Sequence, residues 1–236
     1  MHELRRRAHR YRCSVAPIQR LRAFRSVEGR LGMLRDADLR LAEVGSDDGV
    51  LLDLIFGQGR KRLLVGIDPV VKTTRSWARD HGRAHLVRTL EEAHAITQHV
   101  GMAWSSFTLH HVQAGPLTKL LNRLADLLWP GGLLFVLEDD PGAPDGTPTP
   151  FDRQSAQLSP SERQLMLSVN DYWANVVVYG RGHDDQVHGF QDAPGWIQLL
   201  HRCGFSGERY QRLGFNLRRP HGVPSCAILV RVCERP

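Results

Sequence analysis

The chain has 236 residues, of which 42% are hydrophobic and 24% charged, and its formal net charge is +6 at pH 7. These proportions exclude wholesale disorder, and the length suits one α/β domain that can bury a core without disulfides or a structural metal. The apolar runs are far shorter than the roughly 20 residues of a membrane helix, and no secretory apolar segment opens the chain, so we expect a cytoplasmic protein with no membrane partner.

Arginines are concentrated in residues 1–37, which are predicted to form a basic helical lead-in before a single domain that spans 38–236. Basic segments attract anions, but a solvated basic face is the simpler interpretation of this one. The four cysteines are too widely spaced for a CxxC redox or zinc pattern, so we expect reduced thiols.

From residue 39 onward, short apolar runs alternate with amphipathic helical stretches, a pattern typical of βαβ units and a parallel sheet. Strands are predicted at 39–44, 63–67, 85–88, 102–109, 133–138, 206–213 and 226–232. Helices are predicted at 49–56, 73–81, 91–99, 116–128, 159–180 and 192–205. The WPGG segment after the fourth of these helices is expected to break the chain, and 140–191 is predicted to be a lid-like insertion.

The loop after the first predicted strand, Glu43 to Gly49, is where an open α/β sheet binds ligands. Gly45 permits a tight turn that brings backbone N–H groups close to a ligand, and Gly49 lets the next helix start near the sheet. The second strand ends at Asp68, where a carboxylate can accept hydrogen bonds from both hydroxyls of a ribose. The two features together predict a cofactor that contains adenosine.

The chemistry of this loop discriminates among such cofactors. It lacks the GxGxxG of dinucleotide sites and the Gly-Lys-Ser/Thr triplet of P-loops. Its three carboxylates, Glu43, Asp47 and Asp48, repel a pyrophosphate but suit a ligand with a sulfonium and an ammonium group. S-adenosylmethionine carries both groups, so it is the predicted cofactor.

Four segments occur in the order and spacing of a known family: LAEVGSDDGVL, LLVGIDP, SSFTLHHV and LLNRLADLLWPGGLLFVLED. Over about residues 38–138, and more loosely to the end, the sequence resembles the class I S-adenosylmethionine-dependent methyltransferases. The resemblance implies a Rossmann-like methyltransferase fold, that is, an α/β fold with a mostly parallel seven-stranded sheet and helices on both faces.

The resemblance also implies a set of cofactor-binding residues: Glu43, Gly45, Ser46, Asp47, Gly49, Asp68, Pro69, Thr89, Leu90 and Ser106. The sequence departs from the family at three places. Asp47 replaces the middle glycine of the first motif, Thr89 and Leu90 stand where many members have an acidic residue, and Met102 to Trp104 replace the usual aspartate of the fourth strand.

Candidate catalytic residues lie at the ends of the fourth and fifth predicted strands, which are neighbours in this family. His110 and His111 end the fourth strand, and Glu138, Asp139 and Asp140 end the fifth, so a carboxylate can orient an imidazole there. Histidine has a pKa suited to a base near neutral pH, and we predict that His111, ahead of His110, serves as the base, with Asp139 in support. The alternative is that one histidine only holds the loop.

The predicted helix 159–180 begins with a capping-box pattern and carries candidate substrate-binding residues. Asp171 and Asn175 share a face, and Tyr172 lies beside them, which suits a small, partly apolar acceptor. The alternative is a lid helix that packs Trp173 into the core. His110, Asp139, Asp171, His183 and His188 could converge on a metal, but they lack a recognised ligand spacing, so no metal is expected.

The sequence therefore predicts methyl transfer from S-adenosylmethionine to a small molecule or modified peptide, in specialised metabolism. Two alternatives stay open. The first is an RNA methyltransferase that uses the arginine-rich N-terminus to bind phosphates, and the second is a non-catalytic scaffold with the same fold. A homodimer is a further expectation that the sequence leaves open.

Overall fold

The computed structural model describes residues 40–47, 49, 63–70, 75–79, 82–142, 150–178, 189–215 and 224–233. Within these ranges the strands are β1 Leu41–Val44, β2 Leu63–Ile67, β3 Arg75–Arg79, β4 Gly82–Val87, β5 Val100–Ser106, β6 Leu128–Asp139, β7 Phe205–Phe215 and β8 Pro224–Val232. They form one sheet in the order β3-β4-β2-β1-β5-β6-β8-β7.

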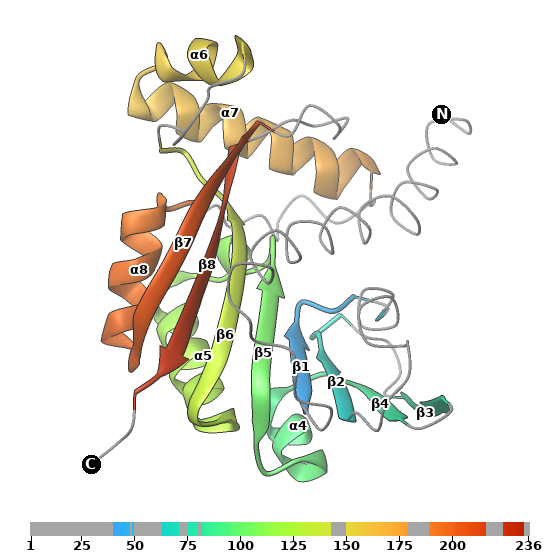
Figure 1. Cartoon of the computed structure of the whole chain (residues 1–236). Coiled ribbons are helices and arrows are strands. Elements are labelled where there is room, and N and C mark those ends of the chain that lie inside the picture. The colour runs from blue at the N-terminus through green and yellow to red at the C-terminus, as the bar shows by residue number, and fades with distance from the viewer. Residues whose placement is uncertain are drawn as a thin grey trace.

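The middle of the sheet is parallel, because β1 pairs in parallel with both β2 and β5, β2 with β4, and β5 with β6. The last two strands form an antiparallel hairpin that pairs with β6. The carboxyl ends of β1, β2, β5 and β6 therefore lie along one edge of the sheet, at the top of Figure 1. The predicted α/β fold with parallel pairing is confirmed, with eight strands described in place of seven.

Both faces of the sheet are buried. One face packs against α4 (Leu90–Ile96), α5 (Ala114–Leu127) and α8 (Ala193–Arg202), which contribute to a single hydrophobic cluster with the strands. A second cluster on the other face includes Trp104 and Phe135, whose ring centroids are 4.5 Å apart.

The predicted helix at 73–81 is wrong, because residues Arg75–Arg79 form strand β3. In its register Arg79 pairs with Gly82, so only two residues separate β3 from β4, as in a tight β-hairpin. The strand contains Trp77, and aromatic residues favour strands over helices. The eighth strand of the sheet comes from this segment.

The WPGG segment interrupts the pairing of β6 rather than the strand itself. Val100 pairs with Leu128 and Met102 with Leu133, so the segment bulges between these two pairs. Gly131 takes a φ of +74° there, a conformation that glycine adopts without strain.

Two further elements differ from their predicted bounds. Strand β5 ends at Ser106, and a 3₁₀ turn, η2 (Leu109–His111), follows it. The predicted helix 159–180 divides into α7 (Pro160–Tyr172) and a π-helical turn, η3 (Trp173–Val178). The predicted capping box is confirmed, since Ser159 and Glu162 bond each other's backbone N–H.

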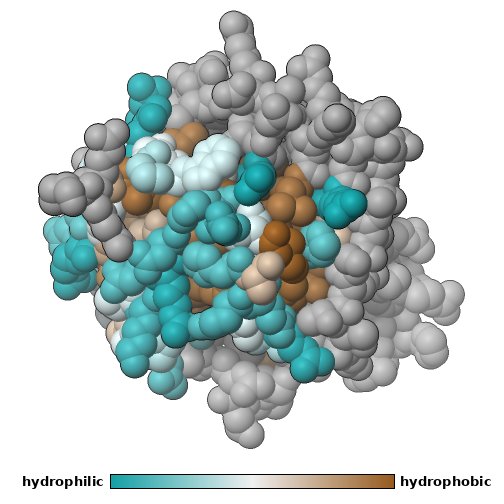
Figure 2. Space-filling model, turned by 90° about the horizontal axis from the view of Figure 1, so that it is seen from below, coloured by the Kyte–Doolittle hydropathy of each residue, from teal (hydrophilic) through white to brown (hydrophobic). Residues whose placement is uncertain are grey.

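Helices α6 (Pro150–Ala156) and α7 lie beyond the carboxyl ends of the central strands (Figure 1). Seen from below, the opposite edge of the molecule presents mainly hydrophilic side chains among its described residues (Figure 2). Open α/β sheets bind ligands at the carboxyl ends of their strands, which here lie under α7.

Several predictions fall outside the described residues: the basic lead-in 1–37, nearly all of the helix 49–56, and the histidines His183 and His188. Of the helices that the structure describes, none has the length and apolar character needed to cross a membrane.

Candidate functional site

The turn after β1 is shaped by a close approach to the segment after β5. Gly45 has a φ of +75°, and a Cβ at this position would lie 2.1 Å from Thr108 Oγ1. The Gly45 N–H donates to the carbonyl of Ile67 at 2.8 Å, which ties the turn to the end of β2. Only glycine fits this position, as the first motif of the resemblance implies.

Asp68 is held rigidly at the tip of β2 and is 5% exposed. Its Oδ2 accepts the Asp47 N–H at 2.8 Å, and its Oδ1 accepts the Val70 N–H at 3.0 Å. Each carboxylate oxygen can accept a second hydrogen bond, so the group keeps capacity for two ribose hydroxyls.

The groups around this turn fit S-adenosylmethionine. The buried carboxylate of Glu43 suits the cationic amino and sulfonium groups of that cofactor, and the buried carboxylate of Asp68 suits the hydroxyls of its ribose. The hydroxyls of Ser46 and Ser106 are buried and have no hydrogen-bond partner among the described residues. Because buried hydroxyls are normally paired, these two are suited to a polar ligand.

The residues predicted to contact adenine lie after β4. Thr89 is exposed and caps α4, since its Oγ1 accepts the Glu92 N–H at 3.2 Å. Leu90 is 4% exposed and its side chain belongs to the hydrophobic core. Pro69 is exposed beside Asp68.

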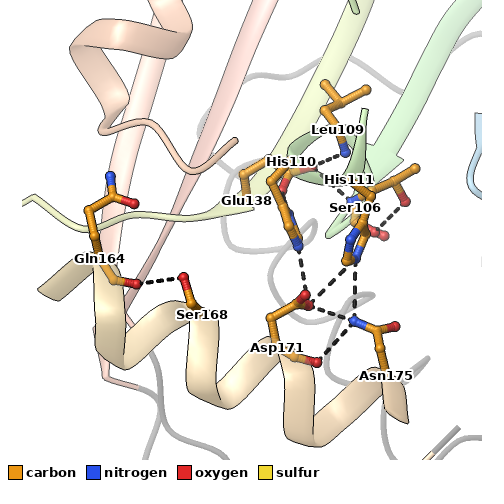
Figure 3. Close-up of polar contacts among 10 residues, drawn as sticks. Ser106, Leu109, His110, His111, Glu138, Gln164, Ser168, Asp171 and Asn175 are labelled. Atoms are coloured by element: carbon orange, nitrogen blue, oxygen red, sulfur yellow. Dashed lines mark hydrogen bonds and ion pairs between the residues drawn. The ribbon is translucent and has the colours of Figure 1, made fainter. Parts of the chain in front are cut away.

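His110 connects the sheet to α7 (Figure 3). Its Nδ1 lies 2.5 Å from Glu138 Oε2, and its Nε2 lies 3.3 Å from Asp171 Oδ1. Glu138 Oε1 accepts the backbone N–H groups of Thr108 and Leu109 at 2.9 and 2.8 Å. The carboxylate that orients the imidazole is thus Glu138, one residue before the predicted Asp139.

Burial alone would lower the pKa of His110, but the charge of Glu138 and hydrogen bonds from the ring to Asp171 and Glu138 outweigh it and raise the pKa to about 10. The charge of Asp139 adds to this effect. A raised pKa favours the imidazolium form of His110, in which both ring N–H groups donate to carboxylates. An imidazolium has no lone pair with which to accept a further proton.

His111 lies on the open side of the same cluster. Its side chain is 19% exposed, against 1% for His110, and its Nε2 lies 3.5 Å from Asp171 Oδ1. Asn175 Nδ2 donates to Asp171 Oδ1 at 2.7 Å and lies 3.4 Å from His111 Nε2. Asp171 and Asn175, the polar residues predicted on this helix, thus lie against the predicted histidines. Tyr172, the third candidate substrate-binding residue, is 37% exposed.

One charged pair beside the cluster was missed by the sequence analysis. Arg212 on β7 donates from Nε to Asp140 Oδ2 at 3.0 Å, and the Gly142 N–H donates to Asp140 Oδ1 at 2.7 Å. Burial raises the pKa of Asp140, although Gly142 and Arg212 oppose the shift. Pairs between distant segments of this kind leave no local signal in a sequence.

No protein-family model matches the chain, and no curated protein matches it in sequence. Solved structures do share its fold. The chain is 15% identical to 1,6-didemethyltoxoflavin-N1-methyltransferase of Burkholderia thailandensis, with a TM-score of 0.57 over 94% of this chain and 80% of that one. The crystal structure of that enzyme contains 1,6-didemethyltoxoflavin and S-adenosylhomocysteine.

Two archaeal structures agree with this. An S-adenosylmethionine-dependent methyltransferase of Archaeoglobus fulgidus is 10% identical, with a TM-score of 0.55 over 94% of this chain and 97% of that one. One from Methanosarcina mazei is 12% identical, with a TM-score of 0.57 over 87% and 98%. The predicted Rossmann-like methyltransferase fold is therefore confirmed.

Proposed function

We propose that this protein transfers a methyl group from S-adenosylmethionine to a small-molecule acceptor bound between the β1 turn and α7. The observation that carries the proposal is the buried Asp68 carboxylate, which two backbone N–H groups fix at the tip of β2. The methyltransferase fold and the acidic turn around Glu43 support the same cofactor.

When bound, S-adenosylmethionine supplies an electrophilic methyl group, and the protein has to align the acceptor and remove its proton. His111 is the group that we propose to meet the acceptor, because its ring is more exposed than that of His110. Asp171 and Asn175 hold that ring from α7. A nitrogen lone pair of His111 can activate the acceptor in one of two ways. It can take the acceptor's proton as a general base, or it can bind a metal cation that in turn binds the acceptor.

His110 and Asp139 have supporting parts in this proposal. His110 links Glu138 on β6 to Asp171 on α7, so it sets the position of α7 over the sheet. Asp139 adds negative charge to the cluster. The segment that contains α6 and α7 then acts as a lid on the acceptor, with Tyr172 at its exposed surface.

Calorimetric titration with S-adenosylhomocysteine tests the cofactor, with Asp68→Ala as the perturbation. Loss of two charge-assisted hydrogen bonds, each about 1.5–3 kcal/mol, weakens binding by roughly 10²- to 10⁴-fold. Asp126→Ala is the matched control, because Asp126 is exposed on α5. We expect the wild type and the control to bind S-adenosylhomocysteine at micromolar concentration. In a second assay with labelled S-adenosylmethionine, we expect transfer of the labelled methyl group to small molecules.

A wild-type protein that does not bind, or an Asp68→Ala variant that binds equally well, would contradict the proposal. Labelling of RNA or peptides in place of small molecules would keep the cofactor and change the acceptor. Absence of binding in every variant would favour the scaffold alternative.

A further inference from the structure

We propose that His110, His111 and Asp171 form a site for a divalent transition-metal ion that binds the acceptor, an inference that rests on the proposed methyl transfer. The three residues come from two elements, η2 and α7, and point toward one another in Figure 3. Each offers one ligand atom, and these atoms all lie within 4.8 Å of one another.

The spacing of these atoms matches a coordination shell. Asp171 Oδ1 is 3.3 Å from His110 Nε2 and 3.5 Å from His111 Nε2. Two ligands that each lie about 2.1 Å from a tetrahedral metal are separated by roughly 3.4 Å. A metal ion can therefore bind among the three atoms with only small movements of their side chains.

The surroundings of the site also match those of metal-binding histidines, which usually donate their second ring N–H to a carboxylate. His110 Nδ1 lies 2.5 Å from Glu138 Oε2, and two backbone N–H groups hold the other oxygen of Glu138. On the other side, Asn175 donates to Asp171 Oδ1 at 2.7 Å. The first histidine and the aspartate are thus oriented before a metal arrives.

The donor set indicates which metals fit. Two imidazole nitrogens and one carboxylate oxygen suit Zn²⁺, Mn²⁺, Fe²⁺ or Co²⁺ better than Mg²⁺ or Ca²⁺, which prefer oxygen ligands. Imidazole binds a metal ion only in its deprotonated form, so metal binding is tighter at higher pH.

Three protein ligands leave coordination positions open on the exposed side of His111, as in catalytic metal sites. The acceptor class that fits is a small molecule with a hydroxyl beside a second oxygen, which can chelate the metal. Coordination lowers the pKa of that hydroxyl, and its proton leaves to water. The oxygen lone pair then bonds to the methyl carbon, while the carbon–sulfur bond breaks and its electron pair stays on sulfur.

Cobalt titration of the full-length, chelator-treated protein without cofactor tests the site, because bound Co²⁺ absorbs visible light. We expect saturation at one equivalent with micromolar or tighter affinity. His111→Ala and Asp171→Ala should each weaken binding by at least about 100-fold, and Glu138→Gln by roughly 10- to 100-fold. Glu91→Gln, an exposed carboxylate on α4, is the matched control and should bind like the wild type.

The inference is overturned if wild-type protein gives no saturable cobalt spectrum, or if His111→Ala and Asp171→Ala bind as the wild type does. Circular dichroism of each variant identifies any loss that comes from unfolding, and for an unfolded variant His111→Gln or Asp171→Asn replaces it. The result is separate from the cofactor titration. Binding of S-adenosylhomocysteine without cobalt would leave the proposed function intact and return His111 to the role of a general base.

Discussion

Glu138→Gln isolates the contact between Glu138 and His110. The glutamine carbonyl can still accept the N–H groups of Thr108 and Leu109, but its amide would face the N–H of His110, so two donors meet in a buried site. Breaking a buried ion pair by removing one partner costs about 3–5 kcal/mol. Because glutamine keeps the backbone contacts, we expect a loss of about 3 kcal/mol in the free energy of unfolding.

The pH dependence of this loss identifies its cause. The pKa of His110 is about 10 in the folded protein, well above its value of about 6.5 in the unfolded chain. A raised folded-state pKa stabilises the protein fully below the unfolded-state pKa, and the stabilisation is lost as the pH rises through about 10. The gap between wild type and variant should therefore be widest near pH 6 and narrow toward pH 10.

Urea unfolding followed by tryptophan fluorescence, with a chelator present, measures the gap at each pH. For a domain of this size, the loss corresponds to a fall in Tm of roughly 6–12 °C. Glu91→Gln is the control, since the Glu91 and Arg123 side chains form an ion pair and are each 60% exposed, and it should leave unfolding nearly unchanged. A gap of constant size across this pH range would refute the assignment of His110 as a buried imidazolium.

Two other predictions concern the β1 turn and the Asp140 pair. Gly45→Ala should weaken S-adenosylhomocysteine binding at least tenfold, because a Cβ there meets Thr108 and the residue has a positive φ. Gly115→Ala is the control, since no atom lies within 4 Å of a Cβ at that position. Equal binding by the two variants would contradict the steric argument. Arg212→Gln should raise the pKa of Asp140 further and destabilise the protein by about 1–3 kcal/mol at neutral pH. Protonation of Asp140 removes its buried charge, so the difference in unfolding free energy between the wild type and Arg212→Gln should shrink as the pH falls toward about 4. Urea unfolding at each pH measures this difference. A difference that grows at low pH would exclude Asp140 as its source.

The turn after β1 and the cluster under α7 differ in how far the sequence predicts them. Gly45 and Asp68 each follow an apolar run directly, so local patterning was enough to predict the turn and the carboxylate at the strand tip. His110 is 28 residues from Glu138 and 61 from Asp171, and no local pattern fixes such pairs.

Two differences between the sequence predictions and the structure have specific physical causes. Successive residues of a strand point to opposite faces, so the choice between Glu138 and Asp139 depends on a register that the sequence does not contain. For residues 73–81, a short polar segment matched a helix as well as a strand, and the hairpin pairing with β4 decided the outcome.

The edges of the sheet limit how copies of this protein can associate. Among the strands that the structure describes, one edge is β3, which has only five residues, two of them arginines, and the other is β7, whose pairing with β8 shifts register twice. Short, charged and irregular edges resist the addition of a further strand, which is the usual route to edge-to-edge aggregation. These features disfavour the addition of a strand from a second copy, so we expect any dimer of this chain to associate through helices or loops.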